Sequence, residues 1–359
     1  MGREGGSTWG WGRCLGARRT TTAGPSGAAP GLIERGAAGY PLGEMVAPLT
    51  SSSPDVLVLG GGGILGEAWM SALLAGLDEL PGFDSRACDS YLGTSAGSIV
   101  ATSLVAGLAP DARLGGLPEQ PPVSARHVEE ASAPLRQALA GAVGLGGSLA
   151  APLVSLAFSS TAASGALLRR AALARVRPGR RSLDGLGRLL ADEAVAWDGR
   201  LRVAAVELET GRRVMFGSPG APPASVSAAV QASCAIPGVF RPVRVGARSY
   251  VDGGAWSPTN MDAADVRRGT RVLCLNPTGS LPLASNALAG MLGRMSRGLA
   301  AAEALTLKRR GATVTTISPD APTAALMGAN LMDPSRRALV IASGLAQGRG
   351  LAAAALQAA

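Results

Sequence analysis

The feature that most constrains the fold is a repeated order of apolar run, glycine-rich turn and helix-like segment near residue 55. Segment 55–59 (DVLVL) is rich in Val and Leu and is followed by four glycines, which is typical of a buried parallel strand. Segment 64–80 then has apolar residues at helical spacing. Segments 88–93 and 95–108 repeat the strand and the helix. This order predicts an α/β domain in which helices cover a mainly parallel sheet.

The rest of the chain continues the pattern. Segments 201–208 and 212–217 flank the turn ETGR and predict a hairpin. We expect a loop at 109–134 and helix within 135–176. Further strands are predicted at 241–254 (two strands and a turn), 270–277 and 312–319, and helices at 224–235, about 283–310 and 334–358.

The N-terminal segment 1–53 differs from everything that follows. It is rich in Gly, Ser, Thr and Arg without sustained periodicity, and no apolar stretch follows its arginine pair as an export signal would need. We expect a disordered, low-complexity tail, and Met45 offers an alternative start. Residues 54–359 are predicted to form one domain.

The composition limits the partners. A formal net charge of +9 and a pI of about 10.5 favour polyanions, either nucleic acid or an anionic membrane, although the charge could serve solubility alone. Aromatic residues make up only 3% and are not interleaved with the arginines, so we expect no nucleic-acid partner. The apolar run 143–158 is interrupted by glycines and is short for a membrane span. It could be a buried helix or a lipid-facing cap, and it motivates an expected peripheral contact with anionic membranes.

The four cysteines predict neither a zinc site nor a disulfide framework. Cys14, Cys88, Cys234 and Cys274 are far apart and lack CxxC spacing. We expect reduced, mostly buried thiols in a cytoplasmic protein, with no metal and no cofactor.

A candidate nucleophile lies where the second strand meets its helix. Gly93-Thr94-Ser95-Ala96-Gly97 is a GxSxG sequence between a strand and a helix, the context of a nucleophile elbow. The flanking glycines Gly93 and Gly97 remove side chains that would collide at so sharp a turn. The following helix adds positive potential near a developing negative charge.

The histidine count points to a carboxylate as the base for Ser95. His127 is the only histidine and stands in a polar, proline-rich stretch, where a solvated surface position is expected. Asp252 ends an apolar strand and is followed by Gly253 and Gly254. A carboxylate there can project into a cleft at the sheet edge that carries the elbow. A plain Asp–Gly turn is the alternative.

The glycine loop between the first strand and helix can present backbone donors. Gly60-Gly61-Gly62-Gly63 and Gly66 allow a tight bend whose N–H groups hold an anion, either a phosphate or the oxyanion of acyl transfer. A simple turn would look the same. A dinucleotide-binding loop would need an acid at the end of the second strand, where this chain instead has GTSAG.

Together these segments, with SCAIPGVFRP (233–242) and PTN (258–260), closely resemble the patatin-like phospholipase family from about Asp55 to Ala264. The resemblance implies a three-layer α/β/α fold and a lipid acyl hydrolase that releases fatty acid from lipid or phospholipid esters. It further implies a Ser95–Asp252 dyad without histidine, and an oxyanion hole made by the N–H groups of Gly61, Gly62 and Gly63.

One position departs from the family. Its members usually carry Arg or Lys in the pattern GGGxRG, where this chain has Leu65. We expect this change to affect catalytic rate or head-group preference rather than reaction type. A catalytically silent, lipid-binding member of the fold is the remaining alternative.

Overall fold

The computed structural model describes residues 52–114, 163–192, 195–280, 287–328 and 330–358. The chain divides into two units, Met1–Met45 and Val46–Ala359, and all described residues belong to the second. The predicted N-terminal tail therefore lies almost wholly outside the described residues and stays a prediction.

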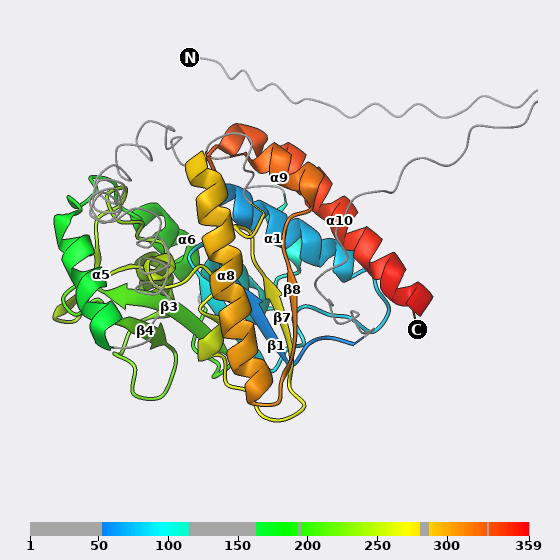
Figure 1. The fold of residues 1–359 in the computed structure, drawn as a ribbon, viewed down its shortest axis with the longest axis horizontal. Coiled ribbons are helices and arrows are strands. Elements are labelled where there is room, and N and C mark those ends of the chain that lie inside the picture. Colours follow the sequence, from blue (N-terminus) through cyan, green and yellow to red (C-terminus); the bar gives the residue numbers. More distant parts are fainter. Residues whose placement is uncertain (1–51, 115–162, 193–194, 281–286, 329, 359) are drawn as a thin grey trace, which may run out of the picture. The chain divides into compact units, whose positions relative to one another are not determined.

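An eight-stranded sheet forms the middle layer of the described unit (Figure 1). Its strands follow the order β5-β6-β3-β2-β1-β7-β8, and β4 pairs with β3. Strands β3, β2, β1, β7 and β8 are neighbours in this order and pair in parallel. Strands β4 and β6 each pair antiparallel with β3, and β5 pairs antiparallel with β6. The strands are β1 (Val56–Leu59), β2 (Ser90–Thr94), β3 (Leu201–Glu207), β4 (Arg213–Phe216), β5 (Val243–Val245), β6 (Arg248–Asp252), β7 (Arg271–Leu275) and β8 (Thr313–Ile317).

Helices cover both faces of this sheet. The principal helices are α1 (Gly63–Leu77), α2 (Ala96–Val105), α5 (Ala163–Arg175), α6 (Asp184–Asp192), α7 (Val226–Ser233), α8 (Ala287–Arg309), α9 (Ala321–Met327) and α10 (Arg337–Ala358). Short 3-10 helices are η1 (Pro110–Arg113), η2 (Gly253–Ala255), η3 (Met261–Ala263) and η4 (Pro334–Arg336).

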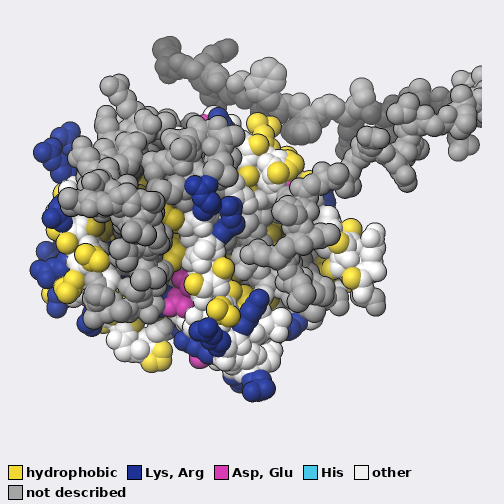
Figure 2. Space-filling view, in the orientation of Figure 1, with side chains coloured by type: hydrophobic (Ala, Val, Ile, Leu, Met, Phe, Trp, Pro, Cys, Tyr) yellow, Lys and Arg dark blue, Asp and Glu magenta, His cyan; other side chains and the backbone are white. Residues whose placement is uncertain are grey.

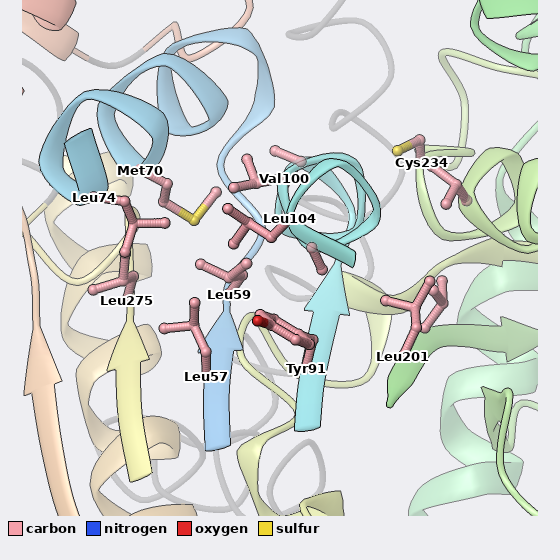
Figure 3. Close-up of a cluster of buried hydrophobic side chains, with 14 of the residues drawn as sticks. Leu57, Leu59, Met70, Leu74, Tyr91, Val100, Leu104, Leu201, Cys234 and Leu275 are labelled. Carbon is pink, nitrogen blue, oxygen red and sulfur yellow. The ribbon is translucent and has the colours of Figure 1, made fainter. Parts of the chain in front are cut away.

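The alternation of side chains along β1 shows how the layers are built. Leu57 and Leu59 belong to a core shared with α1, α2, α7 and α10, and Figure 3 shows both pointing toward the helices that carry Met70 and Leu104. Val56 and Val58 belong to a separate core with residues of α8. Successive strand residues face opposite sides, so β1 is buried between two helical layers. The predicted three-layer α/β/α fold is confirmed.

The C-terminal helix α10 packs along α1. A Cβ at Gly348 would lie 2.3 Å from the carbonyl oxygen of Leu73, so glycine allows the two helices to approach closely. The segment Pro334–Ala358 is, among the described helices, long and apolar enough by length and composition to cross a membrane. Core helices of soluble proteins pass the same test.

The predicted strands and helices correspond to observed ones wherever the structure describes them. The segment 109–134 was expected to be a loop. This prediction was wrong at its start, where residues Pro110–Arg113 form the 3-10 helix η1. Helices α6 and α9 were not predicted. Helix α6 is short and contains Gly185 and Gly187, so its helical propensity is low. Its burial of Leu186 and Leu190 in the core stabilises it instead.

Candidate active site

Ser95 sits on a strained turn between β2 and α2. Its φ is 51°, and Asn260 is the one other non-glycine residue with positive φ in the described part of the chain. A Cβ at Gly97 would lie 2.0 Å from the carbonyl oxygen of Leu59, and a Cβ at Gly93 would lie 2.4 Å from the Cα of Ser98. The two glycines therefore let the turn pack against β1 and its own helix. The strained backbone holds the Ser95 side chain in one direction.

The sheet brings Asp252 to Ser95 across 157 positions of sequence. Strand β6 pairs with β3, which in turn pairs with β2, so Asp252 ends beside the elbow. The Ser95 hydroxyl donates a hydrogen bond to Asp252 Oδ2 at 2.6 Å. Ser95 is 7% exposed and Asp252 is 6% exposed, so the pair is largely shielded from water.

Burial sets the ionisation of this carboxyl. It raises the pKa of Asp252 from its ordinary value of 3.8 to about 6, against the hydrogen bonds from Ser95 and from the Gly254 N–H. The Gly254 N–H donates to Oδ1 at 2.7 Å. A Cβ at Gly253 would meet the carbonyl oxygen of Ala204 at 2.4 Å, so this glycine lets the loop lie against β3. A carboxylate poised near neutral pH is suited to accept a proton.

Two further side chains hold the serine and aspartate loops. Ser233 Oγ accepts the hydrogen bond of the Ser95 N–H at 2.8 Å. The Asn260 side-chain amide donates to Thr94 Oγ1 at 3.1 Å and to the carbonyl oxygen of Gly253 at 3.2 Å. Both residues stand in the segments that carry the family resemblance. Sequence reasoning gave them no role, because only the fold brings their partners within reach.

The glycine loop differs from expectation at one position. The Gly61 N–H donates to the carbonyl oxygen of Pro258 at 2.8 Å, so it is already engaged and is not a free oxyanion donor. The N–H groups of Gly62 and Gly63 form no hydrogen bond with another described residue. Both lie at the start of α1, where the first N–H groups of a helix lack internal partners. Gly66, one turn further on, lets Pro277 approach, because its Cβ would lie 3.1 Å from the proline ring.

Ser95 opens onto a cavity of about 630 Å³. Much of its wall is apolar and comes from several elements, including Ile64, Ile99, Leu183, Leu186, Ile236 and Phe240. Leu65, which replaces the family's usual basic residue, points elsewhere: it is fully buried in the hydrophobic core. An apolar cavity beside a buried hydroxyl–carboxylate pair suits an acyl chain.

The cysteines and the surface charge add little to this site. Cys88, Cys234 and Cys274 are buried and free, and Cys234 lines the cavity. No group of three or more His, Cys, Asp or Glu side chains within the described ranges is placed to hold a metal ion. On the face shown in Figure 2, Lys and Arg side chains lie in several separate groups. Cys14, His127 and segment 143–158 lie outside the described residues, and the predictions about them stay predictions.

The fold and this site define an α/β/α protein with a buried serine–aspartate pair and a glycine-rich loop at one sheet edge. The patatin-like phospholipase family model matches residues 57–265, and the chain belongs to that family. The family implies an ester hydrolase that acts on lipids.

Solved structures similar to the chain include VipD from Legionella pneumophila and the ExoU–SpcU complex from the type III secretion system of Pseudomonas aeruginosa. VipD is 16% identical with a TM-score of 0.39, and the match covers 84% of this chain and 67% of VipD. The second is 20% identical with a TM-score of 0.26, and the match covers 85% of this chain but only 60% of the matched one. No curated protein sequence matches the chain significantly.

Proposed function

We propose that the chain is a serine lipid acyl hydrolase in which Ser95 is the nucleophile and Asp252 the proton acceptor. The 2.6 Å hydrogen bond from Ser95 Oγ to Asp252 Oδ2 carries this proposal. A serine hydroxyl needs an adjacent base to become a nucleophile, and Asp252 is the base in contact with it.

The reaction follows from this geometry. Ser95 Oγ attacks the carbonyl carbon of a carboxylic ester while its proton passes to Asp252. The N–H groups of Gly62 and Gly63 stabilise the resulting oxyanion, with the positive end of α1 adding to their effect. Asp252 returns the proton to the leaving alcohol. It then takes a proton from the water that attacks the acyl-enzyme. As the bond between the acyl carbon and Ser95 Oγ breaks, Asp252 gives this proton to Ser95 Oγ and a fatty acid is released.

Labelling with a fluorophosphonate tests the nucleophile. We expect the wild-type protein to be labelled and to hydrolyse p-nitrophenyl esters, and Ser95→Ala to lose both properties while keeping its melting temperature. Ser227→Ala is the control, because Ser227 on α7 donates a hydrogen bond to the carbonyl oxygen of Gly187 on α6 and does not line the cavity. Wild-type protein that binds lipid but resists labelling would instead indicate a silent lipid-binding protein.

A further inference from the structure

The cavity that contains Ser95 has a charged part. Glu67 and Arg337 are the charged residues among those that line it. Glu67 stands about one helical turn after Gly63 on α1, and Arg337 begins α10. Arg337 Nη2 lies 3.3 Å from Glu67 Oε2. Position 337 is outside the family match, so no family motif assigns it a role.

The guanidinium of Arg337 has an unused donor. Its Nη1 donates to the carbonyl oxygen of Leu114 at 3.2 Å, and its Nη2 donates to that of Arg113 at 2.6 Å. Its Nε is buried and has no hydrogen-bond partner. Buried polar groups are almost always paired, so an unpaired N–H in a residue that lines a substrate cavity favours an acceptor brought by the ligand.

The charges around Arg337 do not balance. Glu67 is 1% exposed, and although burial raises its pKa, the nearby Arg337 and Arg113 lower it. Arg113 is also buried. Two guanidinium groups and one carboxylate leave about one net positive charge in a poorly solvated place. One singly charged anion would neutralise it.

We propose that Arg337 binds the phosphodiester group of a phospholipid substrate whose ester lies at Ser95. A phosphodiester carries one negative charge and accepts charge-assisted hydrogen bonds from guanidinium groups. This inference rests on the proposed function. It names phospholipids as the preferred substrate class, and it places the basic group of the site on α10, since Leu65 offers none.

Substrate selectivity tests the subsite. The probe is the ratio of kcat/KM for a phosphatidylcholine to kcat/KM for the diacylglycerol with the same acyl chains, in the same mixed micelles. Arg337→Gln should lower this ratio by about ten- to one-hundred-fold, which is typical of losing a hydrogen bond to a charged group. Arg337→Lys keeps a point charge and should fall between the two. Equal losses on both substrates would show a structural role and overturn the proposal.

Arg349→Gln is the matched control. Arg349 pairs with Glu79 at 2.7 Å, so it also joins α10 to the end of α1, but outside the cavity. Its ratio should stay within about twofold of wild type. Glu67→Gln should raise the ratio, because it removes the negative charge that competes with phosphate for Arg337. A ratio that falls in Glu67→Gln as it does in Arg337→Gln would indicate only a broken ion pair and would overturn the proposal.

Binding separates this inference from the proposed function. In the Ser95→Ala protein, the dissociation constant of a short-chain diether phosphatidylcholine should rise about tenfold or more when Arg337→Gln is added, relative to the matching dialkylglycerol. That result in a protein without esterase activity would refute the proposed function but support the subsite. If Arg337→Gln instead relieved inhibition by free fatty acid and left the ratio unchanged, the anion would be a carboxylate and the phosphodiester assignment would be wrong.

Discussion

The Asn260 side-chain amide donates a hydrogen bond to the Thr94 hydroxyl at 3.1 Å and so ties the loop after Asp252 to the strand end before Ser95. The same amide nitrogen donates to the carbonyl oxygen of Gly253. Asn260 is fully buried and has a left-handed backbone, with φ of 51°. One side chain therefore fixes the distance between the two proposed catalytic loops.

Asn260→Gly should lower kcat by about ten- to one-hundred-fold with little change in KM, because small displacements of reacting groups are costly. Glycine accepts the left-handed backbone, so the variant removes the amide without adding strain. The rate of fluorophosphonate labelling and the melting temperature are measured together. Wild-type labelling in a folded variant would contradict this positioning role.

Ser95→Gly should be more stable than Ser95→Ala by about 1 kcal/mol, although both lack the nucleophile. The positive φ at position 95 strains any residue with a Cβ but not glycine. Urea unfolding of the two variants measures the difference. Equal unfolding free energies would mean that the turn stores no strain.

Asp252→Asn should lower kcat by about 10²–10⁴-fold, the usual contribution of general-base assistance. Asparagine keeps the size of aspartate but cannot accept the Ser95 proton. The Ser95→Ala/Asp252→Asn double variant should be little worse than either single variant, because groups acting as a unit are not additive. Near-normal turnover in folded Asp252→Asn would require another base.

Asp252→Asn should also raise stability at neutral pH. The folded pKa of about 6 lies above the ordinary 3.8, so the folded state holds a proton that the unfolded state releases between about pH 4 and 6. The free energy of unfolding of the wild type therefore falls as pH rises through that window. Asparagine does not titrate, so the variant does not lose stability in this way. We expect a gain of about 1–3 kcal/mol at pH 7 that vanishes below pH 4, measured by urea unfolding. A lower stability at pH 7 would indicate a structural role for Asp252.

The pH dependence of kcat/KM should follow the same carboxyl. Only ionised Asp252 can accept a proton, so kcat/KM should fall about tenfold per pH unit below about pH 6. Stopped assays with a substrate that does not itself titrate in this range measure the profile. A profile that stays flat down to pH 4.5 would exclude a base with so raised a pKa.

His127→Ala should leave kcat/KM within about twofold of wild type, because the proposed dyad needs no histidine. Ester hydrolysis by the purified variant measures this directly. A loss of about a hundredfold in a protein of unchanged melting temperature would revive a serine–histidine mechanism.

The sequence by itself determined the sheet, the elbow and the order of the motifs. Apolar runs such as 55–59 and the glycines around Ser95 act locally, through strand burial and steric clearance, and local effects are written in neighbouring residues. The single histidine also pointed to a carboxylate as the base, and the strand end before Gly253 and Gly254 pointed to Asp252, without knowledge of any distance.

Only the tertiary structure decided which groups are free to act. Gly61, Gly62 and Gly63 look equivalent in sequence, yet the Gly61 N–H is taken by Pro258, nearly 200 positions away. Asn260 and Arg337 gain their partners in the same way, from segments that only the packed sheet and helices bring together. Hydrogen-bond partners far apart in the chain leave no periodic or spacing signal, because their contact depends on the whole fold rather than on any one segment.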